Sequence, residues 1–185
     1  MDKPAVIDAT RRWISEVVIR LDLCPFARRV FDRDLIRYVV SEVGDEESLH
    51  TQLADELRTL TSTPTAEVET ALLIHPLALL DFLNYNDFLG GADVLLRRLG
   101  LWGTIQLAGF HPDYRFAGTE PEAVENYTNR SPYPMIHLLR EESVSRVADD
   151  PAWLLDIPQR NIATLRRIGR ATMREQLKSF TRPPL

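Results

Sequence analysis

The stretch ETALLI (residues 69–74) decides the fold that we predict, since it ends in four consecutive apolar residues followed by His75 and Pro76. A short apolar run without alternation is typical of a strand that is buried on both faces of a sheet. Two other segments, LIRYVVS (residues 35–41) and TIQLAGF (residues 104–110), read as further strands. The apolar run therefore predicts a sheet with residues 69–74 in its interior.

Helical patterns separate these strands. Leucines at helical spacing lie on one face between the first and second strands, and a longer apolar pattern runs from about Leu79 to Leu99 before Gly100. An alternation of strands and helices makes neighbouring strands parallel. We therefore predict an α/β fold with a small, mainly parallel sheet of three to four strands, a βαβαβ core, flanked by helices.

Further helices are predicted outside this core. Apolar residues at helical spacing follow Pro4 as far as Leu21, and Pro134 suits the first turn of a helix that reaches about Ala148. A last amphipathic helix is expected from about Pro158 to Phe180. The protein should therefore have helices at both its N- and C-terminal ends.

Composition predicts one domain. A chain of 185 residues, 44% of them hydrophobic, is long enough for one core. Residues 158–185 carry seven basic residues and one acidic residue, whereas the rest of the chain is acidic. We expect residues 1–157 to form the α/β domain and the basic C-terminal helix, residues 158–185, to pack on it. An acidic body does not favour nucleic-acid binding.

The single cysteine, Cys24, excludes an intramolecular disulfide. The N-terminus lacks the basic and apolar regions of a signal peptide, and no apolar run approaches the roughly 18 residues that span a bilayer. We therefore expect a cytoplasmic protein without a membrane segment.

Two predicted strands end in the same dipeptide. His75 and Pro76 follow the second strand, and His111 and Pro112 follow the third, with Asp113 next. Proline keeps the preceding residue extended, and open α/β sheets bind ligands outside the carboxyl ends of their strands. We therefore predict a catalytic pocket with His75 and with His111 as general base, oriented by Asp113. Alternatively, each histidine simply ends a strand and bonds to backbone.

A loop of more than twenty residues follows the third strand, and loops of this length are often functional. Several of its side chains could bind a ligand, namely Tyr114, Asn126, Asn129 and Arg130. The loop ends at a predicted helix N-terminus, which favours an anion with Arg130 as its clamp. His137 and Arg140 of that helix would extend the pocket, although Arg140 could equally lie on a solvated face.

Two chemistries remain open for these residues. His75, His111 and His137 could ligate a divalent metal, although they come from separate segments without the spacing of a known metal motif. Cys24 could be a nucleophile with His111 or His75 as its base, or it could be a buried structural cysteine.

The chain resembles a bacterial family, with plant relatives, that is known only as a domain of unknown function. The resemblance rests on five segments within about residues 13–148, namely LDLCPFA, LLIHP, DFLNYNDFL, GFHPDYRFAGT and NYTNRSPYPMIHLLREESV. It implies no activity, cofactor or catalytic residue.

The leading hypothesis for function is a small-molecule enzyme, with or without a bound metal. Its polar or anionic substrate would occupy a pocket at the carboxyl ends of the strands, lined by His75, His111, Asp113, Arg130 and His137. The alternative is a non-catalytic ligand-binding or regulatory protein, in which the same residues recognise an anion and the basic C-terminal region docks a partner.

Overall fold

A four-stranded sheet runs through the centre of the protein in the computed structural model, which describes residues 1–147 and 151–181. The order across the sheet is β1-β2-β4-β3. Its strands are β1 (Ile36–Val40), β2 (Thr70–Ile74), β3 (Ile105–Phe110) and β4 (Met135–Arg140). Every residue of β2 is buried, as the apolar run at residues 69–74 predicts.

The fold is α/β, as predicted, but the prediction of a mainly parallel sheet holds only in part. β1 and β2 are parallel, whereas β4 is antiparallel to both β2 and β3. β1, β2 and β3 therefore all run in one direction, and β4 runs against them. In this register, His137 of β4 lies between Leu72 of β2 and Ala108 of β3.

The segment that contains β4 corrects the prediction of a helix from Pro134 to about Ala148. Residues 135–140 form a strand, and the helix α5 (Glu141–Val147) begins directly after it. Met135, Ile136 and Leu138 are fully buried because the strand is covered on both sheet faces. Pairing with a strand on each side satisfies its backbone, which favours the extended form over a helix.

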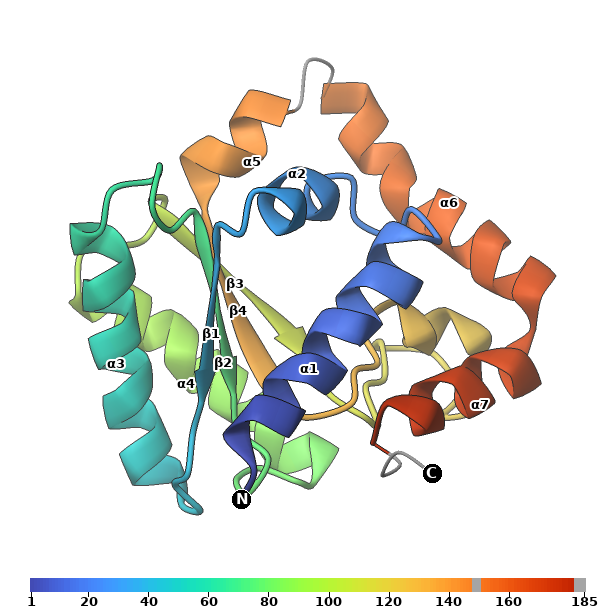
Figure 1. The fold of residues 1–185 in the computed structure, drawn as a ribbon, viewed down its shortest axis with the longest axis horizontal. Coiled ribbons are helices and arrows are strands. Elements are labelled where there is room, and N and C mark those ends of the chain that lie inside the picture. The colour runs from blue at the N-terminus through green and yellow to red at the C-terminus, as the bar shows by residue number, and fades with distance from the viewer. Residues whose placement is uncertain (148–150, 182–185) are drawn as a thin grey trace.

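Helices cover both faces of the sheet (Figure 1). On one face lie α3 (Glu46–Ser62) and α4 (Phe82–Arg98), and on the other lie α1 (Lys3–Trp13) and α2 (Ala27–Asp32). α6 (Pro151–Ile168) and α7 (Arg170–Thr181) lie outside α1 and α2. A 3-10 turn, η2 (Val124–Thr128), interrupts the long loop between β3 and β4.

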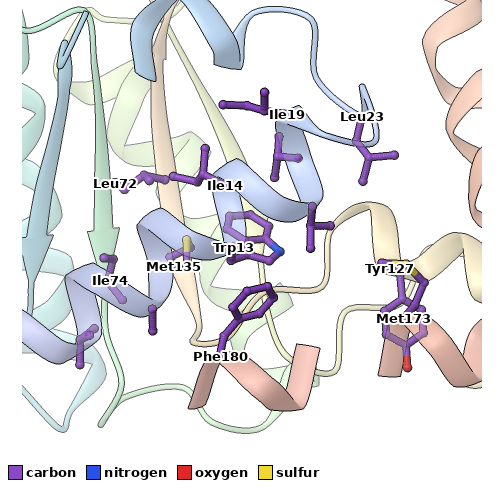
Figure 2. Packing of buried hydrophobic residues seen from close by; sticks show 14 of the residues in the cluster. Trp13, Ile14, Ile19, Leu23, Leu72, Ile74, Tyr127, Met135, Met173 and Phe180 are labelled. Atoms are coloured by element: carbon purple, nitrogen blue, oxygen red, sulfur yellow. The ribbon is translucent and has the colours of Figure 1, made fainter. Parts of the chain in front are cut away.

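Each face of the sheet has its own hydrophobic cluster. Leucines of α3, with Tyr85 and Phe88 of α4, pack on one face. On the other face, Trp13 and Ile14 lie against strand residues such as Leu72, and Phe180 of α7 packs beside Trp13 (Figure 2). The sheet is therefore buried on both sides, and the two clusters do not share residues.

The first helix changes its hydrogen bonding at its end. α1 continues into a π-helical segment, η1 (Ile14–Ile19), in which Arg20 N–H donates to the Ser15 carbonyl, five residues back, at 3.1 Å. Such segments are rare and often occur at functional sites. Here the segment faces the sheet above β2 and β4.

The C-terminal region corrects the prediction of one helix from Pro158 to Phe180. Pro158 lies inside α6, and Gly169, at φ 87°, separates α6 from α7. The amphipathic character predicted for this region is nevertheless seen, since its apolar residues Leu165, Met173 and Phe180 are buried in the cluster that contains Trp13.

Residues 148–150 and 182–185 lie outside the described part, and with them the predicted helix end at Ala148 and the end of the predicted basic segment. Within residues 1–147 and 151–181, none of the helices has the length and apolar character that a membrane span requires.

Candidate functional site

His75 and His111, which we call the clamp histidines, lie at the carboxyl ends of β2 and β3, on the sheet face covered by α4. The ring of Tyr85 from α4 contacts both imidazoles, at centroid distances of 5.8 Å to His75 and 5.1 Å to His111. Both histidines are almost completely buried. The predicted approach of these two side chains is therefore seen, but around a tyrosine ring in a packed interior.

The clamp histidines hold the loop between β2 and α4. His75 Nδ1 donates to the Ala78 carbonyl at 3.0 Å. His111 Nδ1 accepts from the Asp113 backbone N–H at 3.0 Å, so its other nitrogen, Nε2, carries the proton and donates to the Leu79 carbonyl at 3.2 Å. Leu79 has φ 53°, a left-handed conformation that is unusual for leucine. These bonds therefore fix a loop that the backbone alone would not favour.

These contacts leave the clamp histidines little capacity for chemistry. Burial lowers the pKa of His75 to about 4 and also lowers the pKa of His111, so both rings are neutral near pH 7. Both nitrogens of His111 are engaged, and Nε2 of His75 is enclosed without a hydrogen-bond partner. The geometry matches the alternative in which each histidine ends a strand and bonds to backbone.

The polar residues of the long loop also bond to backbone. Asn126 is fully buried and holds four groups of its own loop, including Phe116 N–H and the Glu120 carbonyl. Asn129 donates to the Gly109 carbonyl. Arg130 donates to the carbonyls of Tyr114 and Pro121 and lies over the Tyr127 ring. The ring of Tyr114 packs between Phe82 and Phe116.

Arg140, predicted to extend a ligand pocket, closes the C-terminal end of α3. Its Nη2 donates to the carbonyls of Leu60, Thr63 and Val68. Carbonyls at a helix C-terminus lack partners within the helix, and a guanidinium is well suited to them. The structure therefore gives this arginine a helix-capping role.

His137 lies on the other face of the sheet, below η1, and this corrects the prediction that three histidines share one pocket. The prediction placed His137 on a helix, whereas in β4 its side chain points away from α4 and the clamp histidines. Among the described residues, no three histidine, cysteine, aspartate or glutamate side chains gather closely enough to hold a metal ion. His75, His111 and His137 therefore do not form the predicted metal site.

His137 borders a cavity of about 80 Å³ between the sheet and the segment from α1 to α2. We call this the His137 cavity. Its wall is mainly apolar, with Ile14 and Val18 of η1 facing Leu72 of β2 and Phe110 of β3. The polar or charged side chains in its lining are Cys24, Arg29, Glu69, Thr70, His137, Arg140 and Ser143.

The register of the sheet shows at which end of the strands the polar lining of the cavity lies. Thr70 opposes Leu139, and one step along the face Leu72 opposes His137. Glu69, Arg140 and Ser143 adjoin the first of these pairs in sequence, so the polar lining gathers at the amino-terminal end of β2. The polar part of the cavity therefore lies near the amino-terminal end of β2, whereas the sequence predicts a site at the carboxyl ends of the strands.

Hydrogen bonding fixes the tautomer of His137. Thr70 Oγ1 lies 2.6 Å from the Leu138 carbonyl and 2.7 Å from His137 Nε2. A carbonyl can only accept, so Thr70 donates its one hydrogen to Leu138 and accepts from Nε2–H. Nδ1 of His137 then carries no hydrogen and bonds to no described residue. Because the half-buried ring lines the cavity, a free acceptor lone pair is present in its wall.

Burial keeps the imidazole of His137 and the thiol of Cys24 neutral. It lowers the pKa of His137 to about 4 and raises the pKa of the Cys24 thiol. The imidazole and the thiol are therefore both neutral near pH 7. A nucleophilic cysteine needs a lowered thiol pKa, and the surroundings of Cys24 act in the opposite direction.

Sequence comparison places the chain in a family. A family model described as a protein of unknown function (DUF1415) matches residues 5–175. The chain belongs to the DUF1415 family. Neither a curated protein nor a solved structure matches it. The match agrees with the resemblance noted from the sequence, and the matched part of this DUF1415 chain contains both the clamp histidines and the whole lining of the His137 cavity.

Several residues of the cavity in this DUF1415 protein are not evident from the sequence. The buried carboxylate of Glu69 pairs with Arg29 of α2. The hydroxyl of Ser143 and the indole N–H of Trp13 are buried without a hydrogen-bond partner among the described residues. Glu69 and Thr70 are polar residues at the start of an apolar strand, and this is the one signal that could have drawn attention to them.

Proposed function

We propose that the protein binds a small molecule in the His137 cavity. Ligand sites are typically concave and mainly apolar, with a few polar groups that fix the orientation of the ligand. The His137 cavity has this composition, and the pKa values of its imidazole and thiol are both shifted by burial. Shifted pKa values of this kind are more frequent at functional sites than elsewhere.

One observation carries this proposal, the free lone pair of His137 Nδ1 in the cavity wall. Trp13, Arg140 and Ser143 line the same cavity, and each carries a buried polar atom without a hydrogen-bond partner among the described residues. Buried polar atoms in folded proteins nearly always have a partner, and leaving one of these three without costs about 1–3 kcal/mol. A ligand would supply partners that this part of the fold lacks.

We propose recognition of the ligand by His137 in preference to proton transfer. A general base works best when its pKa lies near the working pH. The pKa of His137 is lowered to about 4, which makes the ring a weak proton acceptor but leaves it a good hydrogen-bond acceptor. An enzyme that uses this cavity would therefore need its acid or base from the ligand.

A second candidate is binding of a polar or anionic molecule at the surface between the long loop and α7. A pocket of about 340 Å³ there is lined by Arg130, Arg174 and Lys178, together with Asp113 and Glu122. This pocket keeps the predicted anion-binding role of Arg130. An NMR titration of the wild-type protein and of an Arg174→Ala variant with inorganic phosphate tests this candidate. Unchanged NMR spectra of the wild-type protein would reject it.

A cavity-filling variant tests the main proposal. Ala27 of α2 lines the His137 cavity, so Ala27→Leu should occupy it, whereas Ala171→Leu places the same side chain on an exposed position of α7. We expect members of a library of small neutral fragments to raise the melting temperature of wild type and of Ala171→Leu. They should have no effect on Ala27→Leu. Fragments that stabilise all three proteins equally, or none of them, would contradict the proposal.

A further inference from the structure

We infer that the ligand of the His137 cavity is a small neutral hydroxyl compound whose O–H donates to His137 Nδ1. This inference rests on the proposed function and narrows it to a chemical class. Nδ1 carries no hydrogen, because Thr70 holds the proton of the ring at Nε2. It can therefore only accept, and a ketone, an ether or a hydrocarbon would leave it without a partner.

The charges around the cavity indicate a neutral ligand. Three charged side chains belong to its described lining. Arg29 and Glu69 pair with each other, whereas Arg140 bonds through Nη2 to two carbonyls at the end of α3 and to that of Val68, and its buried Nε–H has no partner among the described residues. A carboxylate on the ligand could accept from Arg140 but has no hydrogen to donate to His137 Nδ1, and an ammonium group would find no uncommitted carboxylate in a mainly apolar cavity, where a bare charge is costly.

The pKa shifts of Cys24 and His137 agree with a neutral ligand. Burial raises the pKa of the thiol and lowers the pKa of the imidazole, so the same surroundings disfavour an anion and a cation alike. A hydroxyl group donates a hydrogen bond without carrying a charge. It therefore supplies a donor to His137 Nδ1 and adds no charge to the cavity.

The volume of the cavity limits the size of the enclosed part of the ligand. The His137 cavity measures about 80 Å³. An engineered apolar cavity of about 150 Å³ accommodates benzene. By this comparison the enclosed part has on the order of three non-hydrogen atoms, which corresponds to the hydroxyl end of a short branched alcohol.

Isosteric probes can test the class directly. The alcohol 2-butanol and the ketone 2-butanone have the same carbon skeleton, but only the alcohol donates a hydrogen bond. The protonated amine 2-aminobutane and the anion propionate add charge at a similar size. We expect two-dimensional NMR titrations of the wild-type protein to give a dissociation constant about tenfold lower for 2-butanol than for 2-butanone. The two charged probes should bind more weakly than either.

Two further measurements link this selectivity to His137. In wild type, 2-butanol should move the Nδ1 resonance of His137 from the position of an unprotonated nitrogen toward that of a hydrogen-bonded one, whereas 2-butanone should not. The His137→Phe variant should bind the two probes with equal affinity. The Nδ1 resonance is measured in the unaltered protein, so it decides the question even if the variant does not fold.

The outcomes separate this inference from the proposed function. Equal binding of 2-butanol and 2-butanone, with shifts confined to residues around the cavity, would overturn the hydroxyl class and leave the proposed function standing. Tighter binding of propionate or 2-aminobutane would overturn the neutral class in the same way. If none of the four probes perturbs the cavity, or if all of them bind Ala27→Leu as well as wild type, both proposals fail.

Discussion

The clamp histidines are buried on one face of the sheet and the half-buried His137 lies on the other, and they differ in the surroundings of their ring nitrogens. Both nitrogens of His111 bond to backbone, and the free nitrogen of His75 is enclosed by protein. His137 uses one nitrogen to bond Thr70, while the other borders a cavity. All three rings have lowered pKa values, so a pKa shift alone would not distinguish them. Hydrogen-bond partners and empty volume make the distinction.

The largest expected effect concerns a property that the two regions share. The folded pKa values of His75 and His137 are about 4, below the ordinary value of 6.5 that the unfolded chain should show. Unfolding therefore takes up protons between about pH 6.5 and pH 4, and stability falls as the pH falls through this range. Lowering the pH from 7 to 5 should reduce the free energy of unfolding by about 3–4 kcal/mol, as measured by urea denaturation.

A variant of His137 separates its contribution to the pH dependence of stability from that of the clamp histidines. His137→Phe removes one of the two strongly shifted imidazoles and should remove about half of the pH dependence. Lys178→Gln serves as the control. Lys178 lies at an exposed position of α7, so this substitution should leave the pH dependence of the free energy of unfolding unchanged. A pH dependence of wild-type size in His137→Phe would show that folding does not lower the pKa of His137.

Removing a ring from each region should have unequal consequences for stability. His111→Ala leaves the Leu79 carbonyl and the Asp113 N–H without partners and opens a hole beside Phe82 and Tyr85. We expect a loss of about 3 kcal/mol. His137→Ala enlarges an existing cavity and should lose only about 1–2 kcal/mol. Equal losses in chemical denaturation would remove the distinction between the two sites.

Adding a methyl group tests the packing around Tyr85. A Cβ on Gly109 would lie 2.6 Å from both Tyr85 Oη and Leu89 Cδ1, so both of these groups must shift. We expect Gly109→Ala to destabilise the protein by about 2 kcal/mol. Gly90 of α4 is exposed and has open space around it, and Gly90→Ala should stabilise the protein slightly. Thermal denaturation of both variants gives the comparison.

The smallest effect is expected in the His137 cavity. Ala27→Leu adds three carbon atoms next to an empty volume, so it should change the free energy of unfolding by less than about 1 kcal/mol, in the stabilising direction. The same chemical denaturation experiment measures it. A loss as large as that of Gly109→Ala would mean that Ala27 has no free space beside it.

Much of the fold follows from local sequence patterns. The apolar run at residues 69–74 becomes a fully buried strand, and the leucines at helical spacing before it pack as α3. The β4 segment could not be assigned in this way. Met135, Ile136, Leu138 and Leu139 are apolar toward both sheet faces, and such a run does not show whether the segment is a buried strand or a helix. Pairing with β2 and β3, more than twenty residues away in sequence, decides it.

The candidate site was less predictable for the same reason. His75 and His111 do approach one another at strand ends, as the His-Pro dipeptides indicate, but the sequence does not show that their nitrogens bond to the loop at Ala78 and Leu79. His137 was predicted on a helix, and its correct face depends on the strand register of β4. A local pattern can place polar residues on an element, whereas their partners are set by contacts that are distant in the chain.

The position of β4 also constrains the order in which the protein can fold. β2 and β3 precede it in the chain but do not pair with each other, because β4 occupies the place between them. While residues 135–140 are still absent from a growing chain, both strands expose an unpaired edge, which is prone to aggregation. The sheet therefore closes only after residues 135–140 have been synthesised. The floor of the His137 cavity, to which β4 contributes His137 itself, is completed in that same late step.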